Sequence, residues 1–151
     1  MNLKILSLVI IGVCILLPDV CYAFLEKDVH LLNMQNGLAD NTVSAVYKDK
    51  EGFVWFGTRN GLSRYDGRQI TNFEQSNSYP SISNLKEVFD GVLAFVDNGV
   101  FSAFDLKKER FLSVVSSSGQ GIPSRGMLQK NDSLVWVISG SELHLMKRCA
   151  S

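Results

Sequence analysis

Histidine and cysteine are scarce in this chain, and their scarcity excludes most metal sites and nucleophilic sites. The 151 residues include 2 histidines and 3 cysteines. Cys14 and Cys21 lie in the apolar N-terminal stretch, which leaves Cys149 as the remaining cysteine of the chain. His30 and His144 have no second histidine, cysteine or carboxylate at the spacing of metal ligands. We therefore expect no metal site, no cofactor, no disulfide framework and no catalytic residues.

An excess of charge of one sign is also lacking. The 15 lysine and arginine residues are balanced by 15 aspartate and glutamate residues, so the formal net charge is zero at pH 7. A protein that binds nucleic acid or an anionic membrane surface carries a basic excess or a basic patch. We therefore expect no nucleic-acid partner. With 3 prolines, 9 phenylalanines, 4 tyrosines and 2 tryptophans, the composition indicates a folded, β-rich chain.

The N-terminal segment 1–23 has the pattern of an export signal. Lys4 supplies a positive charge, Ile5–Leu17 is almost wholly apolar, and Cys21 and Ala23 place small residues before a cleavage point. The apolar run is short for a membrane span of about 20 residues, although an uncleaved N-terminal anchor is an alternative. We interpret this segment as a secretory signal peptide and expect export to the periplasm. The rest of the chain, 24–151, contains no second apolar span.

The pattern of residues 37–73 predicts four short strands joined by tight turns. The β-branched and aromatic residues gather in four segments, 42–48, 53–58, 62–65 and 69–73. The turns carry glycine, and Asn60-Gly61 suits the positive φ of a tight hairpin. Four strands in about 40 residues form one antiparallel meander, the size of one propeller blade. The expected fold class is all-β, built from four-stranded antiparallel propeller blades.

The same stretch carries a repeat signature. Its positions are Gly37, Leu38, Asn41, Val43, Asp49, Gly52, Trp55, Gly57, Thr58, Gly61, Leu62, Tyr65 and Asp66. They resemble the two-component regulator propeller repeat over one full repeat. The resemblance implies the N-terminal periplasmic sensor part of a hybrid two-component system histidine kinase. It also implies an oligosaccharide ligand, released during polysaccharide breakdown, and catalytic domains that lie outside this chain.

Weaker copies follow at a period of about 40 residues, which is typical of propellers. Trp55 and Trp136 are separated by two such periods, and Gly61 and Gly99, each in an Asn-Gly pair, by one. The predicted map is a strand of a closing or preceding blade at 24–35, blade one at 36–74, a degenerate second blade at 75–115 and a partial third blade, without its fourth strand, at 116–151. A closed propeller needs at least four blades. An incomplete arc of about three blades after a signal peptide predicts a fragment of a longer protein.

Four side chains of the first blade are candidates for ligand contact. Arg59, Arg64 and Arg68 lie around one hairpin in the sequence, and they either line a face for an anionic sugar or are solvated turn residues. Trp55 is either a platform on which a sugar stacks or a packing residue between blades. Its repetition as Trp136 at the blade period favours packing for both.

Other polar positions of the first blade have structural explanations. Asp49, Glu51 and Asp66 lie at turns, where we expect a carboxylate to accept backbone N–H bonds. Their spacing does not match the dense ligand pattern of a calcium loop. The glycines of 57–61 do not open a helix, as a phosphate-binding loop would, so they indicate close strand packing and a hairpin.

Three functions of different classes fit this pattern. The favoured one is a ligand-sensing module without catalytic activity, whose partners are an oligosaccharide and the missing remainder of the sensor. The second is a short secreted repeat protein that forms a homo-oligomeric ring as a binding module. The third is a propeller glycosidase or lyase, which needs inward-facing carboxylates from several blades. The central-facing candidates here are mostly apolar or hydroxyl-bearing, so the third function is the least favoured.

Overall fold

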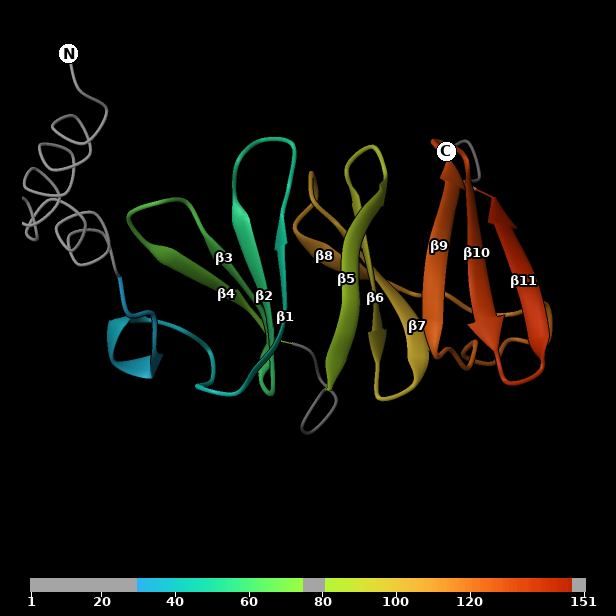
Figure 1. Ribbon diagram of the computed structural model, residues 1–151, viewed down its shortest axis with the longest axis horizontal. Coiled ribbons are helices and arrows are strands. Elements are labelled where there is room, and N and C mark those ends of the chain that lie inside the picture. The colour runs from blue at the N-terminus through green and yellow to red at the C-terminus, as the bar shows by residue number, and fades with distance from the viewer. Residues whose placement is uncertain (1–29, 75–80, 148–151) are drawn as a thin grey trace, which may run out of the picture. The chain divides into compact units, whose positions relative to one another are not determined.

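The computed structural model describes residues 30–74 and 81–147 (Figure 1). The chain divides into two compact units, residues 1–31 and 32–151. In the first unit the described residues are His30 and Leu31, and both are exposed. The predicted signal peptide and Cys149 lie outside the described residues. Within the described part of the chain, no helix has both the length and the apolar character that crossing a bilayer requires.

Antiparallel sheets make up the second unit, and the expected all-β fold is confirmed. The described residues form two four-stranded sheets and one three-stranded sheet. The first sheet contains β1 (Val43–Lys48), β2 (Val54–Thr58), β3 (Gly61–Tyr65) and β4 (Ile70–Phe73). The second contains β5 (Ile82–Phe89), β6 (Val92–Asp97), β7 (Val100–Asp105) and β8 (Arg110–Leu112). The third contains β9 (Gly126–Asn131), β10 (Leu134–Ser139) and β11 (Glu142–Lys147). In every sheet the strands follow one another in chain order, as in a meander.

Left-handed turns join the strands where the sequence has Asn-Gly pairs. Thr58 pairs with Gly61 across the β2–β3 turn, and Gly61 has a φ of 105°. In the β6–β7 turn, Asn98 and Gly99 have φ values of 48° and 78°. Two positive φ values in a two-residue loop are typical of the type I′ hairpin, whose twist matches that of the strands. The Asn98-Gly99 pair therefore helps to set the register of the β6–β7 hairpin.

The segment 24–35 differs from its predicted strand in the residues that the structure describes. Met34–Asn36 is a 3-10 helix, and the described residues before it form no strand. The backbone N–H of Met34 donates to Asn41 Oδ1 at 2.9 Å. Gly37 ends the helix with a φ of 106°. Residues 24–29 lie outside the described part of the chain.

The fourth strand of the second sheet is shorter than the predicted segment 110–115. It ends at Leu112, and Val115 forms an isolated bridge with Gly121 instead. The loop that follows runs back to the second sheet, where the N–H of Phe101 donates to the carbonyl of Ile122 at 2.8 Å. The chain leaves the edge of this sheet early because its next residues bond to one another and to β7.

An aromatic core joins the first two sheets. Trp55 lies 5.6 Å from Phe73 and 5.5 Å from Phe104, measured between ring centroids. The cluster is completed by the buried side chains of Leu62, Ile82, Leu85, Leu93 and Phe95. Burial of large apolar side chains at about 1.5–3 kcal/mol each is the main favourable term between such sheets. The buried residues of this core come from β2 and β3 of the first sheet and from β5, β6 and β7 of the second.

The strands β1 and β5 approach one another closely beside this core. The hydroxyl of Ser44 donates to the carbonyl of Ile82 at 2.6 Å. A Cβ atom added to Gly57 would lie 2.5 Å from Ile82 Cγ2, which is far inside normal contact distance. Glycine at this signature position therefore permits the spacing between the sheets, as the interpretation of close strand packing expects.

A second core joins the second and third sheets. It contains Val88, Ala94, Phe101, Ile122, Val135 and Val137. The opposite face of the third sheet carries apolar side chains that are largely exposed, namely Leu128 at 65%, Ile138 at 45%, Leu143 at 58% and Leu145 at 45%. Trp136 lies opposite Leu128 and Leu145 in the register and is partly exposed. The third sheet thus buries one face against the second sheet and leaves an apolar face open.

Candidate functional site

Asp49 orders one end of the first two sheets. This end, called the rim below, carries the β1–β2, β3–β4, β5–β6 and β7–β8 turns. Asp49 Oδ1 accepts the backbone N–H of Phe53 at 2.9 Å, and Oδ2 accepts the indole Nε1–H of Trp55 at 2.7 Å. Both oxygens of this buried carboxylate therefore have donors, and the indole ring is held in place. The predicted turn role of Asp49 is confirmed, and Trp55 is 1% exposed, so it packs between sheets and offers no free ring face to a sugar.

Arg64 covers the aromatic core at the rim. It lies on β3, and its guanidinium carbon is 5.0 Å from the ring centroid of Phe53, 5.6 Å from that of Trp55 and 5.4 Å from that of Phe73. Its Nη1 donates to Glu109 Oε1 of the β7–β8 turn at 2.7 Å. The interpretation of Arg64 as a solvated turn residue is therefore wrong. The side chain is 20% exposed and links the first sheet to the second.

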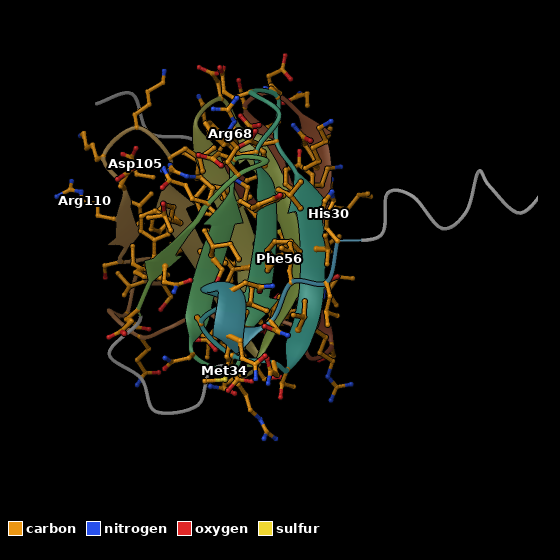
Figure 2. The ribbon with its side chains drawn as sticks, turned by 90° about the vertical axis from the view of Figure 1, so that its left-hand side faces the viewer. His30, Met34, Phe56, Arg68, Asp105 and Arg110 are labelled. Atoms are coloured by element: carbon orange, nitrogen blue, oxygen red, sulfur yellow. The ribbon has the colours of Figure 1, made fainter. Side chains whose placement is uncertain are left out.

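The three arginines of the sequence prediction do not form one face. Because β2 runs away from the rim, Arg59 lies in the β2–β3 turn at the opposite end of the first sheet. Arg68 is exposed in the β3–β4 turn at the rim. Figure 2 shows Arg68 and Asp105 toward one end of the sheets and Met34 toward the other. A shared binding surface for an anionic sugar on Arg59, Arg64 and Arg68 is therefore not formed.

A pocket of about 280 Å³ opens at the rim between the first two sheets. The β1–β2 turn forms its wall on the first sheet, and the β5–β6 and β7–β8 turns form its wall on the second. Its charged lining consists of Asp49, Glu51, Glu87, Asp90, Lys50, Arg64 and Lys107. Its apolar lining comes from Phe53, Trp55 and Leu106. The pocket thus combines hydrogen-bonding groups with apolar walls, as small-molecule sites do.

Glu87, like Asp49, is a buried acid of this pocket. Its side chain is 4% exposed. One oxygen, Oε1, accepts the backbone N–H of Gly91 at 3.1 Å and lies 3.5 Å from Lys50 Nζ. The other oxygen, Oε2, is buried and has no hydrogen-bond partner among the described residues. Glu87 is not among the candidates predicted from the sequence, because β5 also carries Ser83, Asn84 and Lys86 and a further charged residue there gives no distinct signal.

Among the described residues, Asp66, Asp97 and Asp105 have shifted pKa values. Backbone N–H groups of Gln69 and Arg68 lower the pKa of Asp66 at the rim, which agrees with its predicted turn role. The backbone N–H of Lys108 does the same for the pKa of Asp105. Burial raises the pKa of Asp97, at the opposite end of the second sheet, although the N–H of Ser81 bonds to it. These shifts have structural causes and do not indicate an acid–base pair.

The charged groups of the rim pocket are hydrogen-bonding groups that can rearrange. Among the described residues, no group of three or more histidine, cysteine, aspartate or glutamate side chains is placed to hold a metal ion. Lys50 and Lys107 are 66% and 74% exposed and form long ion pairs of 3.5 Å and 3.4 Å with Glu87 and Asp90. Such pairs rearrange at little cost. The pocket therefore offers a carboxylate with a free acceptor oxygen, two adjustable ammonium donors and apolar walls.

Comparison with known proteins identifies the repeat and supports the fold. Residues 37–60 match the family model of the two component regulator propeller. Among solved structures, the chain is similar to the extracellular domain of the putative hybrid two component system BT3049 from B. thetaiotaomicron, with a TM-score of 0.62 and 20% sequence identity. The match covers 79% of this chain and 17% of that one, so the chain spans about a sixth of that domain. No curated protein matches the chain.

Proposed function

We propose that this chain, which carries a two-component regulator propeller repeat on propeller-type sheets, is part of an extracellular sensor of a hybrid two-component system. The observation that carries the proposal is that the same chain matches both the repeat family and the fold of an extracellular domain. Residues 37–60 match the repeat, and 79% of the chain is similar in fold to the extracellular domain of a putative hybrid two component system. The proposed ligand is an oligosaccharide, and the proposed location is the periplasm.

The role of the repeat signature in the fold supports a binding function without catalysis. Thr58 Oγ1 donates to the carbonyl of Gly61 at 3.0 Å and closes the β2–β3 hairpin. Asp49 holds the indole of Trp55, and Gly57 permits the approach of Ile82. These contacts give the three signature residues a structural role within and between the sheets. Ligand contacts are then expected from rim residues that vary between repeats, as in other scaffolds whose loops carry the function.

The genomic test is to read the encoding DNA past the codon for Ser151. We expect further propeller repeats, followed by a membrane-spanning segment and histidine kinase domains. The functional test is an in-frame deletion of the codons for 43–112 from that gene. The deletion should abolish the transcriptional response of the bacterium to the oligosaccharides that induce it. A stop codon followed by an unrelated gene, together with an unchanged transcriptional response, would contradict the proposal.

A second candidate function, a ring of several copies, is favoured by the open apolar faces at the two ends of the sheet series. Val46 on the first sheet is 61% exposed, and Leu128 on the third is 65% exposed. If these faces meet between copies, the purified chain should elute as one discrete oligomer by light scattering and unfold in one cooperative transition. A monomer that aggregates slowly would instead favour the first proposal, because the open faces would then require further blades.

A further inference from the structure

We infer that the rim pocket binds one uncharged sugar unit, whose hydroxyl groups donate to Glu87 Oε2. The inference rests on the proposed function and deepens it, since it assigns a place and a ligand chemistry to sensing. It starts from the carboxylate of Glu87, which is buried at the wall of an open pocket and has one oxygen without a partner among the described residues.

The burial of Glu87 is unfavourable unless something donates to its second oxygen. A buried polar group without a hydrogen bond costs free energy, and a carboxylate costs more than a neutral group. The N–H of Gly91 and the exposed ammonium of Lys50 serve only Oε1. A ligand with a hydroxyl donor inside the pocket would complete the set of hydrogen bonds. The arrangement is therefore better suited to the bound state than to the free one.

The charges of the pocket favour an uncharged ligand over an anion. Its lining carries four carboxylates and three cations. One of the cations, Arg64, is already bonded to Glu109 at 2.7 Å and lies over aromatic rings. An anionic sugar would therefore meet an excess of carboxylates. The hydroxyl groups of a neutral polyol can accept hydrogen bonds from Lys50 and Lys107 and donate to Glu87. Such a ligand therefore bonds to both the cations and the carboxylate of the pocket.

The size of the pocket limits the ligand to one sugar ring. Its volume of about 280 Å³ lies just below the usual range of about 300–1,000 Å³ for small-molecule sites. Phe53 and Leu106 supply the apolar surface against which the C–H face of a sugar packs. Because the pocket opens at the rim, the rest of an oligosaccharide would extend outward, where other rim turns are exposed.

The test compares Glu87→Gln with the matched control Glu142→Gln. Glutamine keeps the size of the side chain, and its carbonyl still accepts the N–H of Gly91, but it removes the charge and replaces Oε2 with a donor. Glu142 has a 75% exposed side chain on the third sheet, far along the chain from the pocket. The full chain and both variants are titrated by calorimetry with cellobiose, maltose, lactose and mannobiose as neutral probes. Digalacturonate and the cationic disaccharide of glucosamine serve as charged comparisons.

We expect one or more neutral probes to bind, and Glu87→Gln to raise the Kd by about tenfold or more, the usual range for a lost hydrogen bond to a charged group. Glu142→Gln should leave the Kd unchanged. The melting temperature of Glu87→Gln should stay equal or rise, because a buried unpaired charge is removed. A lower melting temperature with unchanged affinity would assign Glu87 a purely structural role and overturn the inference.

The remaining outcomes separate the inference from the proposed function. Neutral binding that Glu87→Gln leaves intact would overturn the pocket assignment and leave the sensor proposal standing. Tighter binding of digalacturonate or of the cationic disaccharide than of every neutral probe would overturn the uncharged ligand class. If none of the probes binds, the inference is overturned, and the deletion experiment decides the sensor proposal by itself.

Discussion

Replacing Asp49 with asparagine measures how strongly one carboxylate holds the first sheet together. The buried carboxylate accepts from the N–H of Phe53 at 2.9 Å and from the indole of Trp55 at 2.7 Å. Asparagine has one acceptor oxygen, so one of these donors loses its partner and faces the side-chain NH₂. A hydrogen bond to a charged group is worth about 1.5–3 kcal/mol, and an unsatisfied buried donor costs a similar amount. We therefore expect Asp49→Asn to lower the free energy of unfolding by about 2 kcal/mol.

A double-mutant cycle identifies the indole as the donor that loses its partner. In a Trp55→Phe background that donor is absent, so Asp49→Asn should cost about 1 kcal/mol less than in the parent chain. Urea unfolding followed by circular dichroism gives both values without relying on tryptophan fluorescence. Asp66→Asn is the control, since Asp66 accepts two backbone N–H bonds at an exposed turn and should cost well under about 1 kcal/mol. Equal costs in the two backgrounds would show that the reasoning about the indole is wrong.

Three further predictions concern packing, pH and the open sheet face. Gly57→Ala should lower the free energy of unfolding by about 1–3 kcal/mol, because its Cβ would lie 2.5 Å from Ile82 Cγ2; no loss by urea unfolding would contradict the close approach. Burial raises the pKa of Asp97 above its ordinary value of 3.8, so its ionisation opposes folding as the pH rises through that range. The stability advantage of Asp97→Asn should therefore grow between about pH 4 and pH 7, and a constant difference would refute the cause. Leu143 is 58% exposed, so Leu143→Lys should change the free energy of unfolding by less than about 0.5 kcal/mol. Val137 is fully buried on the other face of the same sheet, so Val137→Lys should leave the chain without a cooperative transition in a thermal melt.

Local sequence signals predict much of this fold. The bounds of β1 to β4 fall within one residue of the predicted segments, because turn glycines and β-branched runs act over a few residues. The turn role of Asp49 was predictable for the same reason. The middle sheet was harder: its first strand, β5, has a left-handed residue at Asn84 and breaks in register near Ser83 and Glu87. These bulges destroy the alternation of apolar and polar residues that reveals a strand.

The candidate site could not be predicted from the sequence, because it is made by contacts between sheets. In the sequence, Arg64 is one of three nearby arginines. Its distinct role depends on its ion pair with Glu109, which belongs to a different sheet. Glu87 reads as an ordinary charged residue until the packing of two sheets buries it. Pairing across such distances depends on the angle between sheets, and no local pattern of residues encodes that angle. The sequence therefore predicted the inter-sheet packing of Trp55 and Gly57, which the repeat signature marks, but not the contacts of Arg64 and Glu87 between sheets.

Because the rim pocket lies between two sheets, a ligand bound there would change the angle between them. Each sheet is stiff along its hydrogen-bonded strands, whereas the first sheet meets the second through side chains. The five residues of β2 extend about 17 Å at roughly 3.3 Å per residue, so the strand is a lever with the pocket at its end. Widening the rim by about 1 Å would tilt the first sheet by about 3° against the second, on this length. If each following sheet tilts by a similar angle, the tilts add up. A sugar bound at the rim would then shift the third sheet, which it does not touch.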